Sequence, residues 1–162
     1  MPVIHLTTFV EAPIERVFDL SRSITLHAKS MQSSGEKAID GVTSGLINLG
    51  ETVTWQAKHL FKERILKSRI SAMTFPTFFE DEMLDGDFKS IRHEHHFKPI
   101  ANGTIMIDLF HFETPYGKFG ELVNNIFLTR YLKKLLAGRN QIVKQYAETN
   151  KWKSILEAAL SG

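Results

Sequence analysis

The sequence predicts an α+β fold in which a curved antiparallel β-sheet packs around one long C-terminal helix. Two observations carry this prediction. Apolar residues recur at three- and four-residue intervals from Tyr116 to about Thr149, which is the period of an α-helix. From Glu51 to Phe112 apolar residues alternate with polar ones, which is the period of a β-strand. A helix of about 30 residues would be roughly 45 Å long and needs a broad apolar surface, which the sheet would supply.

The N-terminal quarter of the chain predicts short elements on either side of a proline. Pro13 suits the first position of a helix, and a serine suits the N-cap of the helix that follows. The expected elements are a strand over Pro2–Val10, a helix from Pro13 to Leu20, a helix over Ile24–Ser30 capped by Ser21 or Ser23, and a strand over Glu36–Val42.

A loop over residues 44–50 is bounded by glycines and carries three large aliphatic side chains, Leu46, Ile47 and Leu49. Loops at protein surfaces are usually polar, so these side chains need an apolar place to go. Two interpretations remain open. The loop folds back as a plug on the core, or it forms a mobile gate over a cavity.

Five further strands follow, separated by turn signals. Pro76, Asp85-Gly86 and Asn102-Gly103 divide the alternating stretch into strands joined by short connections. Consecutive strands with short turns imply an antiparallel meander. The expected strands run from Glu51 through Phe61, over Arg64–Met73, over Phe78–Leu84, over Ile91–Phe97 and over Thr104–Phe112.

Alternation also assigns polar side chains to the inner, apolar face of this sheet. His93 and His95 fall between the inward Ile91 and Phe97. The other polar side chains expected on this face are His59, Arg64, Asp81 and Asp108. Because burying an unpaired carboxylate costs several kcal/mol, each aspartate should pair with a histidine or an arginine.

Length and composition are those of an ordinary globular protein. The 162 residues suffice for one domain with a sizeable core, and we expect a single domain over 1–162 whose residues 150–162 form a short helical tail. The 20 basic and 18 acidic residues show no basic block, which argues against nucleic acid as a partner. The chain has no cysteine, which excludes disulfides, thiolate metal sites and cysteine nucleophiles.

The apolar stretches of the sequence are all shorter than the about 20 residues that a membrane span needs. No secretion signal is visible at the N-terminus. We therefore expect a cytoplasmic protein without stable membrane insertion, either a monomer or a homodimer.

Several segments resemble one protein family. They are residues 50–55 (GETVTW), Asp81 with Gly86 and Phe88, residues 92–97 (RHEHHF), Gly103-Thr104 with Asp108, residues 114–117 (TPYG) and residues 130–140. These are similar to the SRPBCC ligand-binding proteins, often called polyketide cyclase/dehydrase-like, of the START-like helix-grip superfamily. The resemblance covers nearly the whole chain. It implies a curved sheet that grips the C-terminal helix around a hydrophobic cavity, and it supplies no catalytic motif to carry over.

The inward histidines and aspartates allow four interpretations. They form a structural network of satisfied pairs, or they fix a carbonyl or hydroxyl of a ligand in an apolar pocket. Alternatively, His59, His93 or His95 acts as the base of a cyclisation or dehydration, with Asp81 or Asp108 orienting it. Zinc binding by His93 and His95 is the fourth, but no spaced third ligand accompanies them, so we predict neither a metal nor a cofactor.

We favour a binding protein for a small hydrophobic ligand, such as a lipid, a polyketide or an aromatic molecule. The expected ligand-binding residues are Trp55, His59, Arg64, Phe79, Asp81, His93, His95, Asp108, Phe110, Phe127 and Tyr131, with Leu46, Ile47 and Leu49 as the gate loop. The first alternative is a cyclase or dehydratase using the His/Asp set. The second is an interaction module whose cavity is largely filled.

Overall fold

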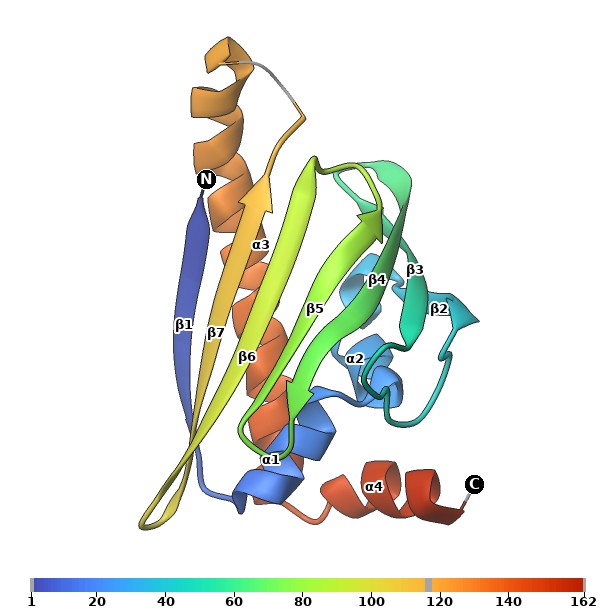
Figure 1. Ribbon diagram of the computed structural model, residues 1–162, viewed down its shortest axis with the longest axis vertical. Coiled ribbons are helices and arrows are strands. Elements are labelled where there is room, and N and C mark those ends of the chain that lie inside the picture. Colours follow the sequence, from blue (N-terminus) through green and yellow to red (C-terminus); the bar gives the residue numbers. More distant parts are fainter. Residues whose placement is uncertain (1, 116–117, 162) are drawn as a thin grey trace.

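The computed structural model describes the backbone of residues 2–115 and 118–161, and their side chains apart from those of 118–125, 160 and 161. The elements follow the predicted order (Figure 1). They are β1 (Val3–Val10), α1 (Ile14–Ser21), α2 (Ile24–Ser30), the 3-10 turn η1 (Gln32–Ser34), β2 (Lys37–Gly41), β3 (Thr52–His59), β4 (Lys62–Thr74), β5 (Phe78–Asp85), β6 (Ser90–Ile100), β7 (Gly103–Glu113), α3 (Lys118–Glu148) and α4 (Trp152–Ser161).

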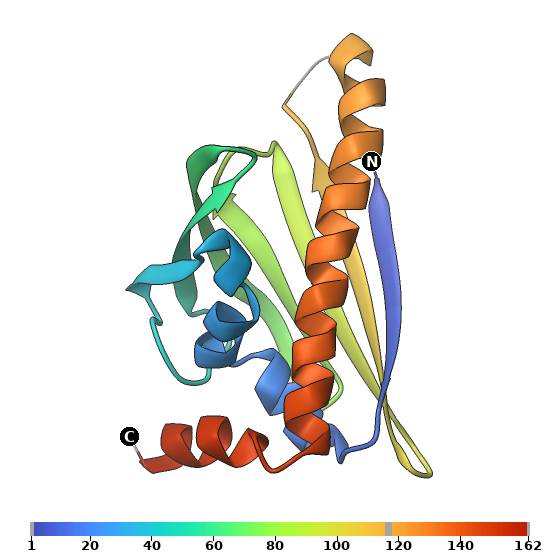
Figure 2. The same cartoon turned by 180° about the vertical axis from the view of Figure 1, so that it is seen from behind.

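The strands form one antiparallel sheet in the order β1-β7-β6-β5-β4-β3-β2. Strands β2 to β7 are a meander of sequential neighbours, and β1 completes the edge beside β7. Figure 2 shows α3 running along one face of this sheet, with α1 and α2 beside it on the same face. The predicted α+β fold, an antiparallel sheet with a long C-terminal helix, is confirmed.

The caps of the two short helices follow from their sequence. Ser23 is the N-cap of α2, where its side-chain oxygen accepts a hydrogen bond from the Leu26 amide at 3.1 Å. Ser21 has a different role, because its hydroxyl donates to the Val17 carbonyl within α1. Pro13 is the N-cap of α1, so this helix begins one residue later than the sequence predicts.

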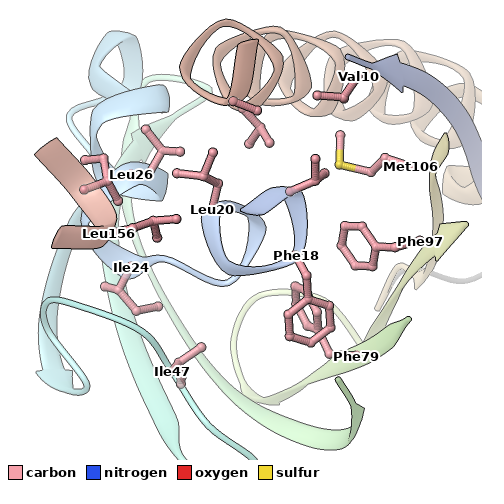
Figure 3. Packing of buried hydrophobic residues seen from close by; sticks show 14 of the residues in the cluster. Val10, Phe18, Leu20, Ile24, Leu26, Ile47, Phe79, Phe97, Met106 and Leu156 are labelled. Atoms are coloured by element: carbon pink, nitrogen blue, oxygen red, sulfur yellow. The ribbon is translucent and has the colours of Figure 1, made fainter. Parts of the chain in front are cut away.

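The main hydrophobic core lies around α1, at one end of the sheet (Figure 3). Phe18 of α1 is fully buried and makes edge-to-face contacts with Phe79 and Phe97, with ring centroids 5.3 and 5.2 Å away. Ile155 and Leu156 of α4 join this core, so the predicted tail helix packs back on the sheet and helices. The region between the sheet and the middle of α3 lies beyond this core, and it is there that the cavity described below opens.

One predicted face assignment is wrong. We expected Phe61 on the inner face with Trp55 and His59, but β3 ends at His59. Leu60 and Phe61 form the hairpin turn to β4, with φ angles of 53° and 65°, and Phe61 is 99% exposed. A two-residue hairpin turn that matches the twist of its strands needs positive φ angles at both central residues. The chain therefore reverses direction at Leu60 and Phe61, and Phe61 does not reach the inner face of the sheet.

None of the helices in the described part of the chain combines the length and apolar character needed to cross a bilayer.

Candidate functional site

A cavity with two adjoining chambers lies between the sheet and α3. The inner chamber has a volume of about 160 Å³ and the outer chamber about 420 Å³. The two share part of their walls, so they adjoin each other. The shared wall residues, which define the waist of the cavity, are Met31, Glu36, Trp55, Leu66, Ile91, Phe110, Leu135 and Leu136.

Polar side chains gather at the inner chamber, and we call Asp81, His93, His95, Asp108, Arg139 and Asn140 the inner cluster. Strand register brings four of them together, because Asp81 lies directly opposite His93 and His95 directly opposite Asp108. The hydrogen bonds run to the diagonal partners. His95 Nε2 is 2.8 Å from Asp81 Oδ2, and His93 Nε2 is 2.8 Å from Asp108 Oδ1.

Helix α3 supplies the two members of the inner cluster that the sequence analysis missed. The Asn140 amide donates to Asp108 Oδ2 at 2.8 Å, and the Arg139 guanidinium lies 3.6 Å from Asp108 Oδ1. Arg139 also donates to the Ser21 carbonyl at 2.8 Å, which ties α3 to α1. A signal existed in the sequence, since two polar residues interrupt the apolar stripe of the helix at this point.

The charges of the inner cluster balance when one of its two imidazoles is protonated. Burial opposes ionisation of both carboxyl groups, but the histidine hydrogen bonds outweigh it and hold the pKa of Asp81 below its usual value and that of Asp108 well below it. Burial also opposes the His95 imidazolium, yet the Asp108 and Asp81 carboxylates outweigh it and raise the pKa of His95. Burial and the neighbouring His95 charge lower the pKa of His93.

The directions of these shifts favour a state with two carboxylates, the Arg139 guanidinium, a protonated His95 and a neutral His93. The two imidazole rings are close neighbours, with centroids 3.7 Å apart. Four members of the inner cluster line the inner chamber, namely Asp81, His93, His95 and Arg139. The other two, Asp108 and Asn140, do not line it. The cluster therefore presents one charged and one neutral imidazole to the cavity.

The inner cluster also contains a potential set of metal ligands. Asp81, His93 and His95 each offer one ligand atom, and these atoms lie within 4.8 Å of one another. Asp81 is the third ligand that the sequence did not reveal for His93 and His95. The same side chains already satisfy each other by hydrogen bonds, and Arg139 adds a positive charge that disfavours a cation.

A second polar group lies at the waist and the outer chamber, and we call His27, Glu36, His59 and Tyr131 the outer cluster. Glu36, His59 and Tyr131 line the outer chamber, whereas His27 lines the inner one. His27 Nε2 is 2.8 Å from Glu36 Oε1, and His59 Nε2 is 3.7 Å from Glu36 Oε2. The other ring nitrogen of His59 lies 2.7 Å from the Tyr131 hydroxyl. The carboxylate partner of His59 is thus Glu36, not Asp81 or Asp108 as expected. Glu36 precedes a strand on the polar side of the pattern, so no sequence signal singled it out.

Burial would raise the pKa of Glu36, but the neighbouring His27 and His59 imidazoles outweigh it and lower this pKa to about 2. Burial raises the pKa of Tyr131. At neutral pH the outer cluster therefore holds an ionised carboxylate and a neutral phenol at the wall of a largely apolar chamber.

The remaining predicted site residues also lie along the cavity, but their roles differ. Arg64 lines the outer chamber and pairs with Asp87 at 2.6 Å, so it is not the partner of the buried aspartates. Trp55 lies at the waist, and the His27 ring lies tilted against it with centroids 4.4 Å apart. In the inner chamber Phe79 stacks on His95, with ring centroids 4.0 Å apart.

Two aromatic residues were expected in the site because of their strand or helix position. Phe110 belongs to the waist, between the two chambers. Phe127 lines the outer chamber but is 57% exposed, and its ring stacks on that of Tyr131 with centroids 6.4 Å apart. Phe127 thus lies at the border between the chamber and solvent.

The aliphatic loop at 44–50 divides between the core and the surface. Ile47 is buried and lines the inner chamber, which is the plug interpretation for this one side chain. Leu46 forms an isolated backbone bridge with Ser23, and Leu49 is 58% exposed. The loop therefore covers the inner chamber, and its opening as a gate stays a prediction.

Several solved structures have the same fold as this chain, although their sequences are only distantly similar to it. The Zhui aromatase/cyclase from a Streptomyces species matches with a TM-score of 0.72 at 12% identity, over 91% of this chain and 93% of that one. The major latex-like protein 151 from Panax ginseng gives 0.66 at 14% identity, over 91% and 98%. The protein TTHA0849 from Thermus thermophilus gives 0.65 at 17% identity, over 88% and 97%.

Neither a scan against protein-family models nor a search of curated proteins gave a match. At these identities the structural matches establish the fold alone. The chain shares the helix-grip fold of these solved structures, which is the fold that the sequence resemblance implied.

Proposed function

We propose that the protein binds a small, largely apolar molecule in the cavity, with a polar end of the ligand at the inner cluster. The observation that carries this proposal is the pair of adjoining chambers between the sheet and α3. The outer chamber alone has about 420 Å³, which lies within the range of ligand pockets in proteins. A lipid, a polyketide or an aromatic molecule fits its mostly aliphatic and aromatic walls.

The two parts of the cavity would hold different parts of this ligand. Burial of an apolar body against the waist, between Leu66 and Leu135, supplies most of the binding free energy. The inner cluster supplies orientation, because His95 and Arg139 can donate to a ligand oxygen while Asp81 can accept. Asp108 and Asn140 hold these groups in place from behind.

A neutral fluorescent probe, N-phenyl-1-naphthylamine, tests this proposal. We expect saturable binding with enhanced probe emission. Ala57→Phe should weaken it at least about tenfold, because Ala57 is buried in the wall of the outer chamber and the added ring would occupy the space. Lys58→Phe is the matched control, since this neighbour on β3 is exposed and the same ring would point away. Equal binding by both variants would contradict a site in the cavity.

Native mass spectrometry of protein purified from its expression host then addresses the ligand itself. We expect an additional mass of a few hundred daltons that denaturation releases. Ala57→Phe should carry less of it than Lys58→Phe, because only the first narrows the cavity.

Acid–base catalysis is the second candidate function. Its support is the pair of adjacent imidazoles in the inner chamber, whose pKa values the surroundings shift in opposite directions. A protonated His95 can give a proton and a neutral His93 can take one, as a cyclisation or dehydration requires. The structural likeness to an aromatase/cyclase also favours it.

The two functions differ in what His93→Gln would change. In an enzyme, this variant should abolish turnover of the molecule identified by mass spectrometry while its binding persists. In a carrier, prolonged incubation with the unmodified protein should return the ligand with its mass unchanged. The third alternative, an interaction module with a filled interior, is disfavoured by the open cavity.

A further inference from the structure

The outer cluster contains an acceptor and a donor that face each other without a hydrogen bond between them. Glu36 Oε1 accepts from His27, but Glu36 Oε2 lies 3.7 Å from His59 Nε2. That separation is too long for a hydrogen bond. Both side chains line the outer chamber. One oxygen atom placed beside the two groups can lie within hydrogen-bonding distance of both.

The tautomer of His59 follows from its contacts with Glu36 and Tyr131. The ionised Glu36 carboxylate favours a proton on the nearer nitrogen, Nε2, so the Nδ1 atom is left as an acceptor. The Tyr131 hydroxyl, 2.7 Å from Nδ1, then donates to it. Tyr131 is therefore a positioning residue that turns the N–H of His59 toward Glu36 and the chamber.

We propose that Glu36 and His59 form a second polar subsite, which binds a hydroxyl group of the ligand. The ligand O–H donates to Glu36 Oε2, and the same oxygen accepts from the Nε2–H of His59. This inference rests on the proposed binding function and narrows its ligand to an alcohol or a phenol. An ether lacks the proton for Glu36, and a carboxylate is repelled by it.

The charges around the subsite support the discrimination against anions. The groups that face Glu36 and His59 are His27 from α2, Arg64 from β4 and Tyr131 from α3. The Arg64 guanidinium is paired with Asp87, so its charge is already compensated. Glu36 keeps its negative charge at neutral pH because its pKa is about 2.

Three naphthalene derivatives that differ at one group test the inference by titration calorimetry. The natural protein should bind 2-naphthol about tenfold more tightly than 2-methoxynaphthalene, as one hydrogen bond to a charged group predicts. In Glu36→Gln this ratio should fall to about threefold or less, and binding of 2-naphthoate should strengthen. Because both affinities of a ratio come from one variant, changes in cavity size or stability cancel.

Companion variants separate the two clusters. Tyr131→Phe should lower the hydroxyl preference about twofold to threefold, because His59 then loses the contact that sets its tautomer. Glu82→Gln is the matched control, because Glu82 is ion-paired with Arg69 and does not line the cavity, and it should leave the ratio unchanged. If Glu36→Gln fails to fold, His59→Phe removes the donor in its place and should lower the ratio similarly.

The possible outcomes are distinguishable. A ratio that Glu36→Gln or His59→Phe leaves unchanged overturns the subsite while the cavity function stands. A ratio that falls in the inner-cluster variant Asp81→Asn but not in Glu36→Gln also overturns it, since the hydroxyl then binds at the inner cluster. Failure of all three naphthalenes to bind the natural protein overturns the cavity function and this inference together.

Discussion

The two polar clusters of the cavity are built in different ways. The inner cluster stands on three adjacent strands, β5, β6 and β7, with two residues from α3, and Asp108 at its centre is fully buried. The outer cluster is assembled from α2, the segment before β2, β3 and α3. Its side chains are only partly buried, and Glu36 and His59 are separated by 3.7 Å.

This difference indicates that the inner cluster stabilises the fold, whereas the outer cluster can change its contacts when a ligand binds. Strand register holds the inner cluster in place, and its charges compensate each other, so removing one member leaves a buried charge unpaired. The outer cluster depends on the relative positions of two helices and a strand. Glu36, His59 and Tyr131 line the larger chamber, where a ligand can replace the missing hydrogen bond.

The largest expected effect is on the inner cluster. Asp108→Asn should lower the free energy of unfolding by about 3–5 kcal/mol, because Arg139 and His95 lose their shared counter-charge in a buried site. Glu36→Gln in the outer cluster should cost only about 1 kcal/mol. Urea unfolding measures both. The exposed pair of Asp87 with Arg64 is the control, where Asp87→Asn should cost less than about 0.5 kcal/mol. Equal costs at Asp108 and Glu36 would remove the contrast between the clusters.

Histidine replacements sharpen the same contrast. His95→Gln should cost about 2 kcal/mol, since both of its carboxylate contacts lie in the buried cluster. His59→Gln should cost less than about 1 kcal/mol, because His59 is less buried and is not hydrogen-bonded to Glu36. Both values come from urea unfolding at pH 6. A larger decrease in the free energy of unfolding for His59→Gln would mean that the outer cluster also stabilises the fold.

The pH dependence of stability should separate the clusters by its sign. The folded pKa of His95 is raised, so its contribution is present below about pH 6.5 and is lost as the pH rises through the folded value. The folded pKa of Glu36 is lowered from 4.5 to about 2, so its contribution is present above 4.5 and is lost as the pH falls toward 2.

Unfolding free energies at three pH values measure this prediction. The difference between the natural protein and His95→Gln should shrink from pH 6 to pH 9, whereas the difference from Glu36→Gln should shrink from pH 6 to pH 3. If the His95→Gln difference instead shrank toward pH 3 and the Glu36→Gln difference toward pH 9, the directions assigned to these two pKa shifts would be wrong. His93, whose pKa is lowered, adds a loss of stability on the acid side. The natural protein and Glu36→Gln share this loss, whereas His95→Gln removes a charge that lowers the pKa of His93 and so reduces it.

The smallest expected effect is that of metal removal. Excess EDTA should shift the melting temperature by less than about 1 °C, because the ligand atoms of Asp81, His93 and His95 are held by hydrogen bonds and Arg139 disfavours a cation. Differential scanning calorimetry with and without Zn²⁺ is the measurement. A rise in melting temperature with Zn²⁺ that Asp81→Asn abolishes would instead make the inner cluster a metal site.

Much of the fold was predictable because its signals are local. The alternation of apolar residues placed Asp81, His93 and His95 on the correct face, since successive side chains of a strand point to opposite sides. The N-cap at Ser23 also depends only on neighbouring residues. The prediction for Phe61 was wrong because alternation does not show where a hairpin turns.

The pairing of the polar groups was less accessible to sequence reasoning. The alternation of side chains places His59 and Asp108 on the same face of the sheet. It does not show how far apart the two residues lie within the seven-stranded sheet. Glu36 is the first residue of the predicted strand over Glu36–Val42, whereas the observed β2 begins at Lys37, and no pattern connected Glu36 with His59 on another strand. The division into two clusters thus depends on strand order and on the path of α3.

By itself the sequence determined the order of helices and strands and the face to which each strand residue points, because periodicity and caps act within a few residues of the chain. The tertiary structure alone decided that Arg139 and Asn140 complete the inner cluster and that Glu36 joins His27 with His59. The physical reason is that these contacts join residues far apart in the chain. Only the packing of α3 and α2 against the sheet brings such residues to hydrogen-bonding distance.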